Sequence, residues 1–545
     1  MTGQRENSLS YWLGVMAIAA VILSFPFFSA TGYETIDTIF HLSRIEGIKE
    51  GLLSDCLPVR IDGYSLNGYG MPLGIMYPDL LLYFPALLRV YGVSLAVSYN
   101  LFWVLVTWLG LAVAWRGFTV WSGNLASGAV AAMLYNSSFI MMIHLGMSPG
   151  DYPAMCALPL IMGALYAVLA RPGGDKYWPE CAAAFTLSAQ SHVLTTLLAV
   201  LLSVGFLLYY ARSWMGSRRC RSAVAKTAVF CLLLNVWRLV PMLYFYTNVS
   251  FHIFAEPWSH SLHEVTSNWP NLVKSQFFVG YPLAALGMFF LGRKTTRGNK
   301  GWLAAVLTMI VLVLMLWQAF PWVKLESLLP TEDFLATRFQ YPHRFLFFGL
   351  PFICYYLGKF IAELPKKYLL VYPATAGLVC CLWGIYFAMY GTWYFYGNVP
   401  QIMGLGERHT WDSVPSYGIQ EDYLYSDVVF RDLRNGKNEV PGPGDFISSA
   451  EIFDVHKRGT AVNFSYNAAT STTVRLPLFY WPGYAARSVQ TGSDLPISAT
   501  NNHIMQVTVP PGTDTVCVHY AGLWWFRIFD IISLLSLFMF IIFLL

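Results

Sequence analysis

The chain has 545 residues, of which 56% are hydrophobic and only 12% are charged. Soluble proteins carry about 25% charged residues, so this chain cannot cover several soluble domains with solvated side chains. The composition excludes a soluble multidomain enzyme and a disordered protein. The formal net charge of +4 is too small for a basic nucleic-acid binder, and no nucleic-acid partner is expected. The sequence therefore predicts a polytopic membrane protein.

About twelve apolar segments are expected to cross the membrane, because a helix of about 20 apolar residues spans the hydrocarbon core. Two segments are ambiguous: 76–92 contains two prolines, an aspartate and an arginine, and 178–190 is short. We expect 178–190 to cross and 76–92 to remain outside as an interfacial or re-entrant helix. The expected spans are 11–28, 94–115, 124–143, 154–170, 178–190, 193–211, 223–244, 273–291, 302–320, 344–361, 368–390 and 523–545.

The distribution of positive charge supports this topology. With 76–92 outside, the basic cluster in 212–226 lies inside, and the outer loops near 144–153, 190–192 and 245–272 contain no lysine or arginine. If 76–92 also crossed, the basic cluster would lie outside. Because lysine and arginine favour cytoplasmic loops, we expect both termini in the cytoplasm. The expected location is a cell membrane, and its lipids are expected partners.

Two outer segments are long enough to carry structure of their own. The expected domains are a first span (1–28), a first outer loop with interfacial helices (29–93), a multi-helix membrane domain (94–391), an outer module (392–522) and a last span (523–545). In the outer module the stretches VNFSYN, TTVRLPLFYW, IMQVTV and TVCVHY alternate as β-strands do. The expected fold class is an all-α polytopic membrane protein with a β-sandwich-like module before the last helix.

The first outer loop carries an unusual polar stripe. In a helix that starts near Thr35, residues Asp37, His41 and Arg44 share one face, since they are spaced by four and three residues. Apolar residues form the other face. This pattern predicts a helix at the membrane interface whose charged side faces a cavity. The alternative is an amphipathic helix at the headgroups with solvated charges.

Further motifs occur in order along the chain. They are 37–44 (DTIFHLSR), 57–61 (LPVRI), 67–70 (NGYG), 77–79 (YPD), 150–153 (GDYP) with 158–160 (LPL), 339–346 (FQYPHRFL) and 476–484 (LPLFYWPGY). Together they resemble the motifs of GT-C membrane glycosyltransferases, and most closely those of the bacterial YfhO-type branch. At 150–153 the match is loose, because the branch commonly has a glutamate where this chain has Asp151.

The resemblance implies an enzyme and a reaction class. GT-C enzymes take a sugar from a polyprenyl-phosphate carrier at the outer membrane face and transfer it, with inversion, to an acceptor. The acceptor expected here is a cell-envelope glycan or lipid-linked polymer, and the expected membrane is a bacterial plasma membrane. Such a transfer needs a base for the acceptor's proton, and the matched position is Asp37. Asp151 is the second candidate catalytic acid; the alternative is a cap at its helix N-terminus.

The leaving phosphate needs donors, and arginine suits that role because its planar guanidinium can hold two phosphate oxygens. Arg344 and Arg238 are the main candidates; the alternatives are interfacial anchoring for Arg344 and snorkelling for Arg238. His192 is a candidate for lining the carrier cavity, or else a helix-start histidine bonded to the backbone. The remaining substrate-binding candidates are His41, Arg44, Arg60, Tyr77, Asp79, Gln340 and His343.

Cofactor use and a rival function stay open. Asp37, His41, His144 and Asp151 could supply oxygen and nitrogen ligands for a divalent metal, but they lack the spacing of a known metal motif. No cofactor is firmly expected. The rival function is a transporter or flippase for lipid-linked glycans. Such proteins tend to contain inverted repeats, which this sequence does not show.

Overall fold

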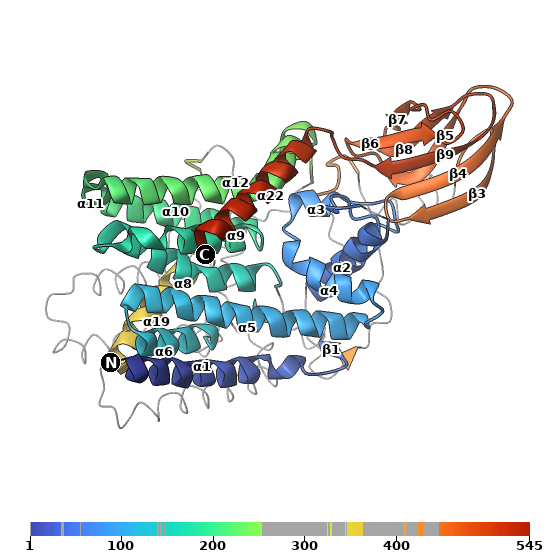
Figure 1. Ribbon diagram of the computed structural model, residues 1–545. Helices are drawn as coiled ribbons and strands as arrows, with labels where there is room; N and C mark the ends of the chain where they lie inside the picture. Colours follow the sequence, from blue (N-terminus) through green and yellow to red (C-terminus); the bar gives the residue numbers. More distant parts are fainter. Residues whose placement is uncertain are drawn as a thin grey trace.

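A computed structural model describes most of the chain. It covers residues 2–33, 37–54, 56–138, 141, 144–146, 148–252, 324, 327–329, 344, 346–362, 408–409, 423–428 and 446–544. This part is mostly helical, with several apolar helices and a small β region near the C-terminal end (Figure 1). The expected spans 273–291, 302–320 and 368–390 lie outside the described residues.

Five of the described helices are long and apolar enough to cross a membrane. They are α1 (Thr2–Ser24), α5 (Leu95–Ser122), α8 (Asp151–Ala170), α12 (Arg218–Asn248) and α22 (Phe526–Leu544). Shorter apolar helices pack beside them: α6 (Leu125–Asn136), α9 (Trp178–Ala189), α10 (Val193–Tyr209) and α19 (Leu346–Ala362).

Three expected boundaries differ from the observed ones. Helix α5 continues to Ser122 and ends at Gly123, whose positive φ of 72° suits a residue without a side chain. Within the span expected at 124–143, helix α6 ends at Asn136, and Ser137 is its C-cap. Helix α12 begins at Arg218, so much of the basic cluster forms its first turns rather than a loop.

Small residues let α5 and α8 pack closely. A methyl group on Gly117 of α5 would lie 2.3 Å from the backbone nitrogen of Leu160, and one on Gly163 of α8 would lie 2.4 Å from the carbonyl oxygen of Gly117. The two backbones therefore touch at these positions, as is common between helices in membranes.

Besides strand β1 (Gly32–Tyr33), the first outer loop forms four helical elements beside the bundle. They are α2 (Thr38–Leu53), α3 (Leu73–Met76), η2 (Leu80–Leu82) and α4 (Tyr83–Val90). Segment 76–92 is thus broken into pieces too short to span a membrane. Exposed apolar side chains follow one side of η2 and α4: Leu80, Phe84, Leu87 and Tyr91.

Helix α2 is buried on both sides. His41 and Arg44, on the polar stripe, are 1% and 3% exposed, while Ile45 on the apolar face is fully buried. The alternative with solvated charges is therefore wrong for these two residues. The helix also begins at Thr38, with Asp37 at its N-cap position, rather than near Thr35. Its polar stripe faces the protein interior.

The β region consists of two antiparallel sheets (Figure 1). The first has the order β3-β4-β9-β6 and the second the order β5-β8-β7. The four stretches expected as strands lie in β4, β5, β8 and β9. The strand bounds are β3 (Glu451–Arg458), β4 (Ala461–Ala468), β5 (Thr472–Phe479), β6 (Tyr484–Ser488), β7 (Ile497–Ala499), β8 (Ile504–Val509) and β9 (Gly512–Tyr520).

The β region is bonded to the first outer loop. The indole nitrogen of Trp481 donates to the carbonyl of Gly70 over 3.1 Å, and the amide of Phe479 donates to the carbonyl of Tyr69 over 2.9 Å. The Lys457 ammonium also donates to the carbonyl of Gly68. The β region and the loop therefore form one packed unit.

Candidate active site

Asp151 is the centre of a buried polar cluster at the N-terminus of α8. Its side chain is 6% exposed, and one oxygen, Oδ1, lies 3.1 Å from Nη1 of Arg344 and 2.8 Å from Nδ1 of His192. The hydroxyl of Thr195 donates to the same oxygen over 2.6 Å. The carboxylate is thus neutralised by an arginine that lies 193 residues further along the chain.

The contact between Asp151 and His192 determines which imidazole nitrogen carries a proton. Two acceptors would repel each other at 2.8 Å, so Nδ1 carries a proton and donates it to the carboxylate. His192 also stands at the N-cap of α10, 3.3 Å from the amide of Thr195. That second contact would need Nδ1 as an acceptor, and the shorter bond to a charged partner is the stronger of the two.

Asp37 lies beside this cluster, at the N-cap of α2. Its carboxylate does not cap the helix, because no side-chain hydrogen bond is made there. Burial raises the pKa of Asp37 to about 6; the Asp151 carboxylate reinforces this rise, and the Arg344 guanidinium opposes it. Asp37 is therefore ionised at neutral pH and more basic than an ordinary aspartate.

Tyr77 separates this acidic cluster from a second, cationic one. Its ring centre lies 6.1 Å from that of His41 and 5.9 Å from that of His192, and the guanidinium carbon of Arg44 lies 4.5 Å from its centre. A methyl group on Gly150 would lie 3.3 Å from the Tyr77 hydroxyl, so the α8 N-terminus packs against this ring.

Arg44 is positioned by its neighbours on the first outer loop. Nη2 donates to the carbonyl of Pro78 over 2.6 Å, and Nη1 lies 3.2 Å from Nδ1 of His41. Since arginine only donates, this His41 nitrogen accepts. Burial and the neighbouring Arg44 charge hold the pKa of His41 well below its usual range, which agrees with a neutral ring.

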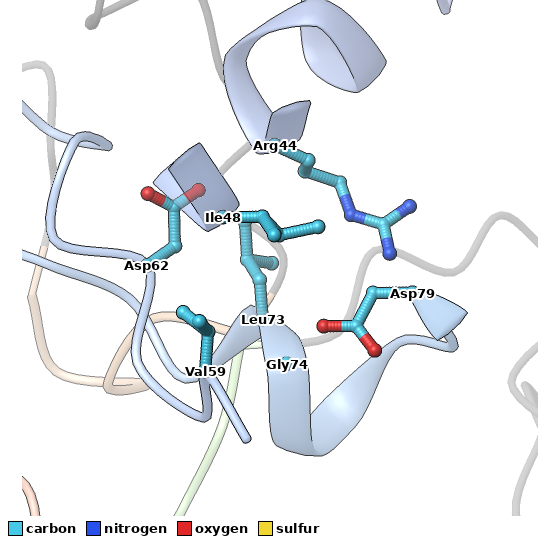
Figure 2. Close-up of a pocket in the computed structure, with 7 residues that line it drawn as sticks. All are labelled: Arg44, Ile48, Val59, Asp62, Leu73, Gly74 and Asp79. Carbon is cyan, nitrogen blue, oxygen red and sulfur yellow. The ribbon is translucent and has the colours of Figure 1, made fainter. Parts of the chain in front are cut away.

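Arg44 and Asp79 face each other across a small cavity (Figure 2). The volume open to the centre of a water molecule in this cavity is about 10 Å³. This is enough for about one ordered water. Asp62 lies on another side of the cavity, where its carboxylate accepts hydrogen bonds from the amides of Tyr64 and Ser65 and from the Ser65 hydroxyl. The cavity therefore has charged groups in its wall.

Arg238 supplies a second guanidinium near Asp79. It is 5% exposed, and Nη1 donates to the carbonyl of Ala189 over 3.0 Å. Among the described residues, its Nε and Nη2 have no hydrogen-bond partner. Buried donors are almost always paired, so these two nitrogens mark a place for an acceptor.

The structure thus brings most of the sequence-predicted residues together in two adjoining clusters. Arg60 lies to one side, where Nη2 pairs with Oδ1 of Asp530 on α22 over 2.6 Å. Gln340 and His343 lie outside the described residues. Arg344 lies two residues before the start of α19, not in the first turn of the expected span 344–361.

The sequence did not single out Tyr423, which lies near Arg44 and Arg238. Its φ is 67°, an uncommon conformation for a bulky residue. Backbone hydrogen bonds hold it in place: its amide donates to the carbonyl of His252 over 3.0 Å, and the amide of His252 donates to the carbonyl of Leu424 over 2.8 Å. No spacing in the sequence links this segment to the first outer loop.

Within the described residues, no three histidine, cysteine, aspartate or glutamate side chains gather as a metal ion would require. Asp37, Asp151, His41 and His144 are described, and Asp151 already has an arginine and a histidine as partners. This arrangement of donors does not fit a divalent metal.

No family profile matches the sequence, and no curated protein gives a significant match. The chain is similar in part to the arabinofuranosyltransferase AftD from Mycobacteria, with 16% identity, 71% of this chain and 27% of that chain covered, and a TM-score of 0.44. It is also similar to ArnT from Cupriavidus metallidurans bound to undecaprenyl phosphate, with 14% identity, 69% and 70% covered, and a TM-score of 0.39. The matched part is about a quarter of the length of AftD.

Proposed function

We propose that this protein is a GT-C-type membrane glycosyltransferase. It moves a sugar from a polyprenyl-phosphate carrier to a cell-envelope glycan or lipid-linked acceptor at the outer membrane face, with inversion. The observation that carries the proposal is the carboxylate of Asp37, which makes no capping hydrogen bond, has a raised pKa and lies beside the Asp151 cluster and near Tyr77, against which the buried Arg44 guanidinium packs. The order of GT-C-like motifs along the chain supports the same reaction class.

Asp37 is the general base in this proposal. The acceptor oxygen attacks the anomeric carbon as its proton passes to the Asp37 carboxylate, and the bond between that carbon and the carrier phosphate breaks. A base works best when its pKa lies close to the operating pH. The rise in the pKa of Asp37 to about 6 therefore suits this role.

Asp151 acts as a positioning residue rather than as a second base. Its Oδ1 is already engaged by Arg344, His192 and Thr195, which would lower its basicity toward an acceptor. In this role it holds the Arg344 guanidinium near Asp37, where the positive charge keeps the base ionised. Arg344 thereby acts on Asp37 and not on the carrier phosphate.

Arg238 and Arg44 bind the carrier phosphate. Arg238 has two buried donors without partners among the described residues, whereas Arg344 has an anion within 3.1 Å. Negative charge grows on the phosphate as the glycosidic bond breaks, so donors placed there stabilise the transition state more than the substrate.

The proposal is tested with the purified full-length chain and a panel of sugars linked to undecaprenyl phosphate. Transfer to a cell-envelope extract should depend on a lipid-linked donor. Asp37→Asn should bind donor with unchanged affinity and lose roughly 10²–10⁴-fold in turnover, the usual contribution of a general base.

Glu50→Gln is the matched control, because Glu50 lies on the same helix and pairs with Lys49 over 3.3 Å at a partly exposed site. It should transfer sugar at the wild-type rate. The transporter would be favoured, and the proposal contradicted, by one result. In it, both the wild type and Asp37→Asn move lipid-linked glycan across a vesicle membrane without transferring sugar.

A further inference from the structure

Asp79 is a buried acid for which the proposed reaction has no use. It is 4% exposed and lies just before η2, and its carboxylate forms part of the cavity wall opposite Arg44 (Figure 2). Within the described part of the chain, no arginine or lysine nitrogen lies within 4 Å of its oxygens. The acid and the guanidinium thus face each other across a gap that an ordered water would fill.

The charged groups around Asp79 come from every side. Arg44 on α2, Arg238 on α12 and Arg60 on the first outer loop all favour its ionised form. Tyr83 on α4 faces it too and stays neutral, because burial raises its pKa well above its usual range. The second acid of the cavity wall is Asp62: burial raises its pKa to about 6, while hydrogen bonds from Ser65 and from two amides and then the Arg44 charge oppose the rise. Asp62 is therefore ionised at pH 8 whether or not phosphate is bound.

We propose that Asp79 is the resident counter-anion of the Arg44 and Arg238 pair, and that it takes up a proton when the free carrier phosphate binds to that pair. The proposal rests on the proposed function, since it assigns the same two arginines to the phosphate. It gives Asp79 a role in product binding that goes beyond that assignment.

Charge balance distinguishes the donor from the product. A sugar-linked carrier phosphate has one negative charge, so two arginines balance that charge and one ionised Asp79. After transfer the carrier phosphate is a monoester with a charge of up to −2. The two arginines then balance the phosphate alone, and a third buried negative charge would be unpaired. Uptake of one proton from solution by Asp79 restores neutrality without breaking a covalent bond.

The environment of Asp79 suits this exchange. Burial raises the pKa of Asp79 to about 7, although Arg44 and then Arg238 oppose the rise. Near neutral pH the residue can thus gain or lose a proton readily. A phosphate that competes for the two arginines would raise this pKa further, so that binding and proton uptake reinforce each other.

The test is the binding of undecaprenyl phosphate to the full chain in lipid nanodiscs between pH 6 and pH 8.5. Proton uptake is measured by calorimetry at pH 8 in two buffers with different ionisation enthalpies. For the wild type we expect close to one proton per lipid at pH 8, and a Kd that rises about tenfold from pH 6 to pH 8, since a pKa near 7 predicts that rise.

The Asp79→Asn variant should take up no proton at this position. Its Kd for undecaprenyl phosphate should not rise with pH, so at pH 8 the variant should bind the lipid about tenfold more tightly than the wild type does. Asp62→Asn is the matched control, because Asp62 lies in the wall of the same cavity but has its own hydrogen bonds. It should keep the proton uptake and pH dependence of the wild type. A purely structural role for Asp79 would change stability without changing proton uptake.

The outcomes separate the two proposals. A wild type that binds undecaprenyl phosphate without proton uptake at pH 8 overturns the role of Asp79 and leaves the glycosyltransferase proposal standing. If Asp79→Asn takes up as many protons as the wild type, the role of Asp79 is also overturned, and the glycosyltransferase proposal again stands. The wild-type measurement decides the question even if Asp79→Asn fails to fold. A wild type that does not bind the lipid at any pH contradicts the carrier specificity, and the role of Asp79 falls with it.

Discussion

Arg344 illustrates how one buried charge depends on another. It forms an ion pair with Asp151 at a site where both side chains are less than 10% exposed. Arg344→Gln should lower the free energy of unfolding by about 3–5 kcal/mol, because it leaves Asp151 buried with its charge less well compensated. The double variant Asp151→Asn with Arg344→Gln should lose less than the single one. Thermal unfolding of the purified variants in detergent measures both effects.

The ion-pair interpretation is contradicted if Arg344→Gln unfolds at the wild-type temperature. It is also contradicted if the two substitutions lower stability by the sum of their separate effects, since residues that interact are not additive.

Asp37 should set the pH dependence of transfer. The base must be ionised, and its pKa is raised to about 6, so kcat/KM should be constant above pH 7 and fall about tenfold per pH unit well below pH 6. The Arg344 charge lowers the pKa of Asp37. Removal of that charge should therefore raise this pKa and move the fall in kcat/KM to higher pH. Initial rates for the wild type and Arg344→Gln give both curves. A wild-type rate that stays constant down to pH 4.5 would remove Asp37 as the base.

For single residues, the sequence indicates which acidic and basic side chains are candidates for the site, but it does not indicate their partners. The spacing of Asp37, His41 and Arg44 predicted that they lie near the start of one helix and on the same face. The bond between Asp151 and Arg344 joins residues 193 positions apart, and no periodicity reveals such a pair. For the same reason the sequence suggested a phosphate ligand at Arg344, where the geometry offers an aspartate.

Helix α3 shows how an element can depend on one missing side chain. A methyl group on Gly74 would lie 2.0 Å from the carbonyl oxygen of Val59, and both residues line the cavity between Arg44 and Asp79. Gly74→Ala should therefore move the backbone at the cavity, reduce stability by about 1–3 kcal/mol and weaken binding of undecaprenyl phosphate.

Gly205→Ala is the control for this prediction, since nothing lies within 4 Å of a methyl group at that position of α10. Alanine should be neutral there or stabilise the helix by up to about 1 kcal/mol. Equal effects of the two substitutions on unfolding temperature and lipid binding would show that the close contact at Gly74 has no importance.

The elements themselves were predictable where a single period dominates. Strands β4 and β8 follow the alternation of their sequences, and α5 and α8 follow long apolar runs. For helix α2 the sequence left two interpretations open, because amphipathic periodicity normally indicates one solvated face. Here the polar face is covered as well, by residues of the first outer loop and of the bundle, and the identity of those neighbours depends on the tertiary fold.

At the scale of the whole molecule, the β region and the candidate site belong to the same end. In Figure 1 the β sheets and helices α2 to α4 lie toward one end, and the N-terminus and α11 (Ala211–Gly216) lie toward the other. The bonds from Trp481 and Phe479 to the first outer loop hold the β region beside the loop that carries Asp37 and Arg44. The β region thereby restrains the loop that forms most of the candidate site.

The orientation of this arrangement is the last prediction. Arg218, Arg219 and Arg221 start α12 at the end that lies away from the β region, and lysine and arginine favour the cytoplasmic side. We therefore expect the β region and the candidate site to face outward. Ser448→Cys should react with a membrane-impermeant maleimide on intact cells, and Ser217→Cys should react only after the cells are broken.

Cys56, Cys220, Cys231 and Cys517, which are free and partly exposed, are first replaced by serine, and the same protein without an introduced cysteine measures the background labelling of the remaining thiols. Their replacement should leave sugar transfer unchanged, which serves as the control for folding. If Ser217→Cys reacts on intact cells and Ser448→Cys does not, the β region and the candidate site lie in the cytoplasm. A carrier whose sugar is presented at the outer face could then not reach Asp37, and the donor would have to be one available on the cytoplasmic side.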